Sequence, residues 1–423
     1  MGRNRRRGLS ARSVADAGWL YVAHIARYAA PLLIYPVLTR RLGVEGFGVY
    51  AAGLSLALIV SVIVDYGLSV SGPRDIAAGC ADRGRIIGEA VVLRAVLILP
   101  AIGAGLCLAS LTPALSGAAG ATAIAILLGV GQGAGLLWYF QGVRDPAPMA
   151  MLEVGFMLAA ALSILASPGL GVAGALAIQA AGVWSGAAVG AARVWRRERI
   201  AWPSRASVGR ALQDGGPLFL SRAVIAAYTG AGVFAVAALA GPAQAALYGV
   251  ADRLVSAAGS LMRPLAGLIA PRIAGLLTHD PGAAFRTARW TLASAFAAST
   301  AVCIGLIAGA PILVRGLFGA AFVEAEASLR LLAATLPLVA VSQVMGLHLM
   351  TSLRMDGRFA AMTAAGCAAT LAAAWSLAPA FGATGMAWAR IMGEAVVVLI
   401  CVGCLKGHWA ALFPARSRHV ASV

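Results

Sequence analysis

The sequence predicts an all-α membrane protein with about twelve transmembrane helices, and two observations carry this prediction. The first is composition: 61% of the 423 residues are hydrophobic and only 12% are charged, a balance that water-soluble domains do not show. The second is length, because the apolar stretches repeatedly reach the roughly 20 residues that a helix needs to cross a bilayer. We therefore expect a chain that crosses the membrane many times.

Breaking the apolar stretches at glycine, proline and clusters of charge gives twelve spans. Their approximate limits are 14–38, 46–69, 86–110, 119–140, 148–167, 171–193, 214–239, 243–270, 289–314, 326–350, 359–379 and 383–405. The first span is too long for a cleaved signal peptide. It is also followed by Pro36 and Arg40-Arg41 in place of a small-residue cleavage site, so we expect it to be retained.

The basic residues indicate the orientation of these spans. With the N-terminus inside, the inner segments hold 23 of the 33 lysines and arginines, and the outer loops hold only Arg40, Arg41 and Arg315. Cytoplasmic loops are enriched in lysine and arginine, so both termini are expected in the cytoplasm. The net charge of +17, which would suggest nucleic acid as the partner of a soluble protein, is here expected to set topology, and we expect no nucleic-acid partner.

A basic connection that includes Trp195 and Trp202 divides the chain near its middle. We expect an N-terminal lobe of six helices over 1–195, a cytoplasmic linker over 196–213, and a C-terminal lobe of six helices over 214–423. Nucleic-acid binding is one interpretation of the linker, but a segment lying against anionic headgroups with its tryptophans at the interface is favoured. Two lobes that start from the same side indicate a parallel repeat with a substrate site between them.

Arginines within the spans are the candidate binding residues. A charge at bilayer depth costs at least about 2.5 kcal/mol, so it is tolerated mainly where it faces a bundle interior or a wet cavity. Arg27 and Arg222 lie in corresponding spans of the two lobes and are expected to face each other, where two guanidiniums could bind a diphosphate. The alternative is that each pairs with a carboxylate. Arg253 is a weaker candidate because it adjoins Asp252.

Other charged residues suggest coupling or structural roles. Asp65 and Glu153 lie at membrane depth and are candidates to carry a coupling proton or sodium ion, although Asp65 could equally cap the loop that follows it. Arg390 and Glu394 have the i, i+4 spacing of a helical ion pair, for which a structural role is favoured. Glu89 and Arg94 are expected at the interface.

The sequence shows no pattern of an enzyme. Lys406 is the only lysine, which excludes a Walker A loop and a lysine Schiff base. Cys401 and Cys404 form a single CxxC without a second pair, and the five histidines are scattered. We expect no catalytic residues, no metal ligands and no cofactor.

Short segments in order along nearly the whole chain resemble a known family. The sequence is similar to the polysaccharide flippases of the multidrug/oligosaccharidyl-lipid/polysaccharide superfamily, in particular the O-antigen (Wzx-type) branch. The resemblance rests on Pro31 through Arg40-Arg41-Leu42-Gly43, Glu45-Gly46-Phe47-Gly48, Asp65-Tyr66-Gly67, Arg74-Asp75-Ile76-Ala77, Trp138-Tyr139-Phe140-Gln141-Gly142, Ala245 to Arg253, Leu317-Phe318-Gly319 and Gly382-Ala383-Thr384-Gly385.

The resemblance implies a V-shaped bundle of two six-helix lobes around a central cavity that opens alternately to each side. It implies a flippase of the bacterial inner membrane that carries a polyprenyl-diphosphate-linked oligosaccharide for O-antigen, capsule or exopolysaccharide synthesis, with the bilayer and a polysaccharide polymerase or other export proteins as partners. Pro31 and Pro36 in the first span, and Gly215-Gly216-Pro217 in the seventh, suggest helices that bend during such a cycle; static kinks are the alternative.

Two other functions stay open at this point. A cation-coupled multidrug exporter of the same superfamily would be expected to line its cavity with acids, whereas arginines prevail here. A membrane-embedded glycosyltransferase or polysaccharide polymerase would usually have a long extramembrane loop for catalysis, and the longest predicted connection has only about 20 residues.

Overall fold

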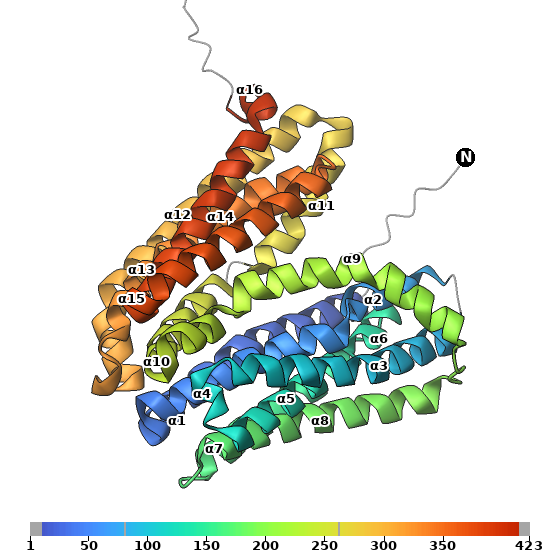
Figure 1. The fold of residues 1–423 in the computed structure, drawn as a ribbon. Helices are drawn as coiled ribbons and strands as arrows, with labels where there is room; N and C mark the ends of the chain where they lie inside the picture. Colours follow the sequence, from blue (N-terminus) through green and yellow to red (C-terminus); the bar gives the residue numbers. More distant parts are fainter. Residues whose placement is uncertain (1–10, 80–81, 261–262, 414–423) are drawn as a thin grey trace, which may run out of the picture. The chain divides into compact units, whose positions relative to one another are not determined.

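The computed structural model describes residues 11–79, 82–260 and 263–413, with the side chains of 11–29 and 263–268 left aside (Figure 1). The described chain is helical, without strands. Its elements are α1 (Ala11–Asp65), α2 (Leu68–Ala78), α3 (Arg83–Ser110), α4 (Pro113–Ser116), α5 (Ala119–Gly133), α6 (Leu137–Gly142), α7 (Ala147–Ala166), α8 (Val172–Arg197), α9 (Arg205–Gly230), α10 (Gly232–Ser260), α11 (Arg263–His279), α12 (Pro281–Leu313), η1 (Val314–Phe318), η2 (Ala320–Phe322), α13 (Ala325–Ala333), α14 (Thr335–Ser342), η3 (Gln343–Met350), α15 (Asp356–Cys404), η4 (Lys406–His408) and α16 (Trp409–Leu412).

Nine helical segments within the described ranges are long and apolar enough to cross a membrane. Two of the helices involved are far too long for one passage. α1 has 55 residues and α15 has 49, or about 80 and 70 Å at 1.5 Å per residue, against a hydrocarbon core of about 30 Å. Each therefore supplies two passages.

A glycine breaks each of these long helices where a loop is predicted. Gly43 has φ 66° and ψ −176°, and Gly382 has φ 55° and ψ −130°. A residue with a Cβ is strained at such angles. Glycine has none, so it can turn the chain here. Gly241 breaks α10 in the same way, and the part of α10 before it continues the passage of α9. Counting each half of α1 and of α15 separately turns the nine segments into eleven passages, and α9 is not among them, so the twelve predicted spans stay a prediction.

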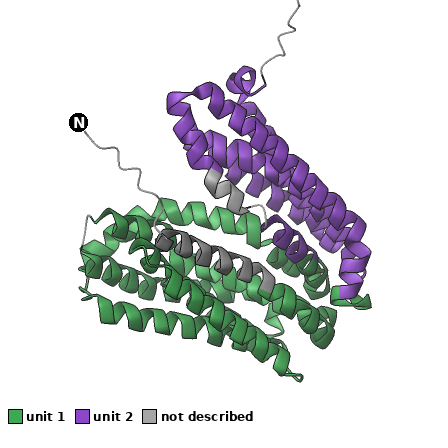
Figure 2. Ribbon diagram, turned by 180° about the vertical axis from the view of Figure 1, so that it is seen from behind, with its two compact units in different colours: residues 1–250, 317–322 green, residues 251–316, 323–423 purple. Residues whose placement is uncertain are grey.

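The chain forms two compact units (Figure 2). Unit 1 comprises Met1–Val250 and Leu317–Phe322, and unit 2 comprises Ala251–Gly316 and Val323–Val423. The division falls within α10, whereas the predicted lobes divide at the basic linker. Most of that linker is helical, because α8 runs to Arg197 and α9 starts at Arg205. The two six-helix lobes stay a prediction.

In unit 1 the helices pack around α1, which contacts α3, α5, α7, α8 and α9. Small residues allow the closest approach. A Cβ at Gly129 of α5 would lie 2.5 Å from the carbonyl oxygen of Ala57, and one at Gly133 would lie 2.6 Å from that of Ser61. The glycines of this span are therefore needed for helix packing.

The segment between α12 and α13 also belongs to unit 1. Its Phe322 is fully buried and meets the ring of Phe47 edge-on, with the ring centroids 5.9 Å apart. Phe47 follows the Gly43 break in α1. Phe47, which belongs to a segment that carries the family resemblance, thus has a packing role.

In unit 2, α12 packs against α11, α13 and α14, and α15 packs against α13 and α14. The two halves of α15 lie close together, because a Cβ at Gly393 would be only 1.8 Å from the hydroxyl oxygen of Thr370. Cys401 is fully buried beside the sulfur atoms of Met350 and Met362. This cysteine therefore serves as a small apolar side chain.

Candidate functional site: charged groups in the membrane-spanning helices

Arg222 lies in α9, in the seventh predicted span. It is seventeen residues after Arg205 and nineteen before the break at Gly241. Its side chain is exposed and makes no hydrogen bond or ion pair with any side chain that the structure describes. Of the predicted binding arginines it is thus one that is open to a ligand.

The other two predicted binding residues are Arg27 and Arg253, and only Arg253 has a described side chain. Arg27 lies in the first half of α1, and its side chain falls outside the described residues, so its expected position opposite Arg222 stays a prediction. Arg253 lies on α10 in unit 2, where it and Arg390 interact electrostatically with Asp252. Arg253 is partly buried and engaged in contacts of its own.

The predicted pair Arg390 and Glu394 is confirmed. One terminal nitrogen of Arg390 lies 3.2 Å from Oε1 of Glu394, and Nε donates a hydrogen bond to the same oxygen at 3.3 Å. Glu394 is only 2% exposed. With Asp252 and Arg253 this makes two acids and two bases from α10 and α15, a balance of charge suited to holding helices together.

Asp65 forms an ion pair that joins α1 to α3. Its Oδ1 lies 3.6 Å from a terminal nitrogen of Arg94, and both side chains are largely buried. Arg94 is buried within the protein, with 6% of its surface exposed, and its expected place at the membrane interface stays a prediction. Asp65 also accepts hydrogen bonds from the backbone and the hydroxyl of Ser69 at 3.2 and 2.7 Å, so it caps α2 as well.

The guanidinium of Arg94 reaches a second helix break. It donates a hydrogen bond at 3.1 Å to the carbonyl of Ala134. Ala134 lies between α5 and α6, where the carbonyl lacks an intrahelical N–H donor. Its central carbon also lies 5.8 Å from the centre of the Trp138 ring, within cation–π range. One buried arginine therefore fixes the ends of α1 and α5 and the start of α6.

Tyr66 links this ion pair to α9. Tyr66 and Gly67 both have positive φ, 47° and 83°, which ends α1 directly after Asp65. The Tyr66 ring stacks on Phe219 with centroids 4.9 Å apart, and its hydroxyl donates to the carbonyl of Leu212 at 3.2 Å. A Cβ at Gly215 would lie 2.9 Å from the Tyr66 ring. The predicted bending segment of α9 is thus held by the break in α1.

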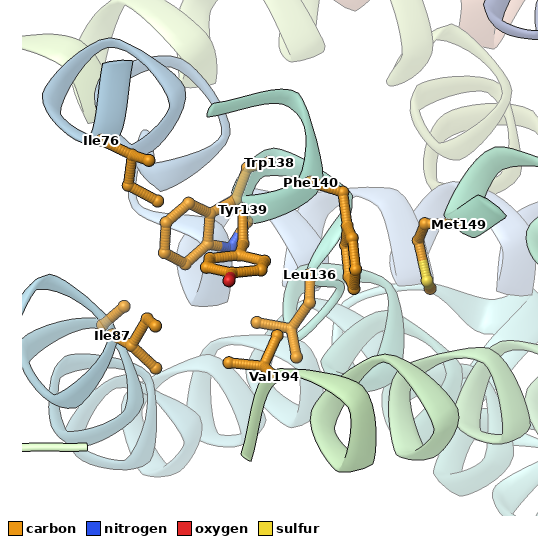
Figure 3. Close-up of a cluster of buried hydrophobic side chains, with 9 residues drawn as sticks. Ile76, Ile87, Leu136, Trp138, Tyr139, Phe140, Met149 and Val194 are labelled. Carbon is orange, nitrogen blue, oxygen red and sulfur yellow. The ribbon is translucent and has the colours of Figure 1, made fainter. Parts of the chain in front are cut away.

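Trp138, Tyr139 and Phe140 of α6 lie in a buried cluster with Ile76, Ile87 and other apolar residues (Figure 3). The hydroxyl of Tyr139 donates to Glu198 at 2.7 Å, and Arg83 lies 3.6 Å from the same carboxylate. These contacts join α6 to the start of α3 and the end of α8. This motif therefore has a structural role at the arginine-rich end of the unit.

The connection from α8 to α9 is docked on α3. The backbone nitrogen of Ala201 donates to the carbonyl of Gly84 at 3.2 Å. A Cβ at Gly88 would lie 2.0 Å from the carbonyl oxygen of Ala201. Trp195 and Trp202 remain 60% and 74% exposed, and the position of their rings at a membrane interface stays a prediction.

Two further charged residues, Glu153 and Arg41, lie on or against α7. Glu153, the second predicted coupling acid, is partly buried on α7 and is engaged in a contact. Arg41 is predicted in an outer loop and caps the end of α7, donating to the carbonyls of Ile164, Leu165 and Ser167 at 2.7, 3.0 and 2.9 Å. The last carbonyls of a helix lack intrahelical partners. Here only that of Ile164 also accepts a backbone N–H, from Ser167 at 3.4 Å, so Arg41 supplies donors that the end of α7 lacks.

The chain is similar to known proteins over most of its length. The model of the family described as "Polysaccharide biosynthesis protein" matches residues 13–277. A protein of Escherichia coli (strain K12) assigned as an O-antigen transporter is 24% identical over 410 residues, which covers 92% of this chain and 96% of that protein. A protein of Shigella dysenteriae with the same assignment is 23% identical, with 92% and 98% covered.

Solved structures show the same fold. The lipid II flippase MurJ in an inward closed conformation aligns with a TM-score of 0.70 at 12% identity, covering 93% of this chain and 88% of that one. An inward-facing multidrug resistance MATE family transporter of the MOP superfamily aligns with a TM-score of 0.63 at 18% identity, covering 96% of both chains. The predicted all-α polytopic membrane fold is confirmed.

Proposed function

Because the chain belongs to the polysaccharide biosynthesis protein family, we propose that it is a flippase that moves a polyprenyl-diphosphate-linked oligosaccharide across the bacterial inner membrane. Both relatives assigned as O-antigen transporters match it over 92% of its length. The solved folds alone do not decide the cargo, since a lipid flippase and a multidrug transporter share them. The sequence relatives favour the polysaccharide substrate over the multidrug exporter.

Arg222 is the observation that carries the proposal. It has a positive charge in the seventh predicted span and no carboxylate partner among the described side chains. A charge at this depth needs an anion or water to offset its desolvation. A diphosphate supplies that anion, and its oxygens match the planar fork of a guanidinium. Arg27 is proposed to bind the same group, and Arg253 is a weaker third candidate.

The diphosphate and the sugars would occupy the cationic cavity while the polyprenyl tail stays in the bilayer. This division keeps the tail out of a polar pore, where its apolar surface would have to leave lipid. Translocation of this kind breaks and forms no covalent bond, and we assign no catalytic residue. A polysaccharide polymerase or another export protein would receive the translocated product.

Alternating access is proposed to involve α1 and α9. α1 contains Pro31 and Pro36 before its break at Gly43, and α9 contains Pro217 next to Gly215 and Gly216. Proline removes a backbone hydrogen bond and favours a bend. The stack of Tyr66 on Phe219 supports a coupled movement of the two helices.

Asp65 and Glu153 are the proposed coupling acids. Asp65 has a defined partner, so protonating it would remove the charge that compensates Arg94 and would change how α1, α3 and α5 are joined. This is a local charge change at a helix break, the kind of event that can bias a conformational equilibrium.

Mass spectrometry of lipid-linked oligosaccharides in a deletion strain tests the proposal. We expect the intermediate to accumulate in the inner leaflet without this protein, and surface glycan to return when the gene is restored. Susceptibility to cationic drugs is measured in the same strains. Normal surface glycan with increased drug susceptibility would favour the multidrug exporter, and loss of the intermediate itself would favour a glycosyltransferase.

A further inference from the structure

The outer face of α7 carries a groove that the proposed transport function does not use. Its volume is about 630 Å³, and its described lining consists of the apolar residues Ala147, Pro148, Met151, Leu152, Gly155, Phe156 and Ala159, with Arg193 of α8 as the one charged group. We propose that this groove binds an anionic phospholipid of the bilayer, with its phosphate at Arg193 and one acyl chain along α7. This inference does not rest on the proposed function.

The groove has the direction and length of one leaflet. Its lining extends from Ala147 to Ala159, a rise of about 18 Å along a helix. Half of the hydrocarbon core is about 15 Å. Arg193 lies beside its first turn, since one terminal nitrogen is 3.4 Å from the carbonyl of Pro148. The charged end of the groove is therefore at the arginine-rich end of the unit, and the apolar end lies deeper.

Arg193 can recognise a phosphate. It is partly buried, and no carboxylate among the described side chains lies within ion-pair distance of it. Its neighbour Arg197 is instead paired with Asp145 at 3.2 Å. The single long contact to Pro148 leaves most of the five guanidinium donors of Arg193 available. Basic pockets between transmembrane helices on the cytoplasmic side are suited to anionic lipid headgroups.

The headgroup must provide the selectivity. Bulk lipid is as apolar as the groove, so transfer of a chain into it gains little from the hydrophobic effect. An acyl chain that fits the groove instead gains van der Waals contacts with its walls, which would otherwise have no neighbouring atoms on that side. Gly155 creates part of that hollow, because a Cβ at this position would have no atom within 4 Å. The length of the groove favours an acyl chain over a polyprenyl chain, which is longer than one leaflet.

Photo-crosslinking tests the site directly. The full-length protein is placed in phosphatidylcholine nanodiscs that contain a trace of phosphatidylglycerol with a diazirine on one acyl chain, and the labelled peptides are mapped by mass spectrometry. We expect label on α7 around Met151 and Phe156, and about tenfold weaker competition by unlabelled phosphatidylglycerol for Arg193→Gln, the loss of one charge-assisted contact. Gly155→Phe should remove the label on α7.

Two variants are matched controls. Arg196→Gln removes an exposed arginine three residues from Arg193 that does not line the groove, and Gly103→Phe adds the same ring at an exposed helical glycine of α3 with equally open surroundings. Both should label α7 like the wild type. Melting temperatures of all variants show whether each one is folded.

Three results would overturn the proposal. Equal labelling by a phosphatidylcholine probe would mean that the headgroup is not recognised. Unchanged α7 label in a folded Gly155→Phe would place the chain elsewhere. Displacement of the label by polyprenyl phosphate at a concentration where phosphatidylglycerol has no effect would make the groove a site for the carrier lipid instead.

Discussion

The carboxylate of Asp65 lies 3.6 Å from the guanidinium of Arg94, and this pair joins the break between α1 and α2 to the break between α5 and α6. Both residues are largely buried in a membrane-spanning part of the chain. An ion pair in this setting couples three helix ends through one contact. It therefore sets the internal geometry of unit 1.

Breaking this pair on one side should be costly. Arg94→Met leaves the Asp65 carboxylate buried without compensation, for which we expect a loss of about 3 to 5 kcal/mol of stability. Adding Asp65→Asn should recover most of that loss, because the remaining amide is neutral. Arg85→Met is the control, since its pair with Glu89 is exposed and such pairs contribute about 0.3 to 0.5 kcal/mol. Thermal unfolding in detergent would show additive losses if the pair were not coupled.

Arg41 should not be replaceable by lysine. Its guanidinium serves three carbonyls at the end of α7 at once, whereas an ammonium is a compact point charge without the planar fork. We expect Arg41→Lys to lower the melting temperature and to speed amide hydrogen exchange in the last turn of α7. Lysine behaving as the wild type in both measurements would mean that charge alone is sufficient.

Two glycines should respond to alanine in opposite directions. Gly43→Ala forces a side chain into φ 66°, ψ −176°, so we expect a loss of about 1 to 3 kcal/mol. Nothing lies within 4 Å of its Cβ position, so the effect would come from the backbone alone. Gly103→Ala lies within the regular helix α3 in equally open space and should be neutral or stabilise by up to about 1 kcal/mol. Equal effects in an unfolding assay would argue against the break at Gly43.

Membrane topology can be read with reporter fusions. Fusions near Leu115, Pro168, Pro242, Phe322 and Pro379 should be periplasmic, and fusions near Asp82, Arg199, His279 and Asp356 cytoplasmic. The reason is the excess of arginine and lysine on one side of the predicted spans. A cytoplasmic signal at Pro242 would contradict the arrangement of six spans followed by six.

The positions of the helices could be predicted because their signals are local. Gly43, Gly241 and Gly382 each lie in or beside a predicted loop, and each is a true break with positive φ. The Arg390–Glu394 pair could be predicted for the same reason, since i, i+4 residues on a helix always lie on one face. Apolar length and glycine position are properties of a few neighbouring residues.

The partner of Asp65 could not be predicted in this way. Arg94 is 29 positions away, and its burial depends on how α3 is rotated against α1 and on where α5 ends. The only signals were indirect: the Asp65-Tyr66-Gly67 break and the glycines around Ala134. The cap that Arg41 provides for α7 depends likewise on a contact over more than 120 positions.

The central claim is that Arg27 and Arg222 bind the diphosphate of the cargo, and the double variant Arg27→Ala, Arg222→Ala tests it most directly. Surface glycan, inner-leaflet lipid-linked oligosaccharide and melting temperature in detergent are measured on the same strains and protein. We predict a folded and abundant protein with accumulated intermediate and little surface glycan, and only partial rescue by lysine at both positions. Normal surface glycan from a well-folded double variant would contradict the cationic-cavity mechanism.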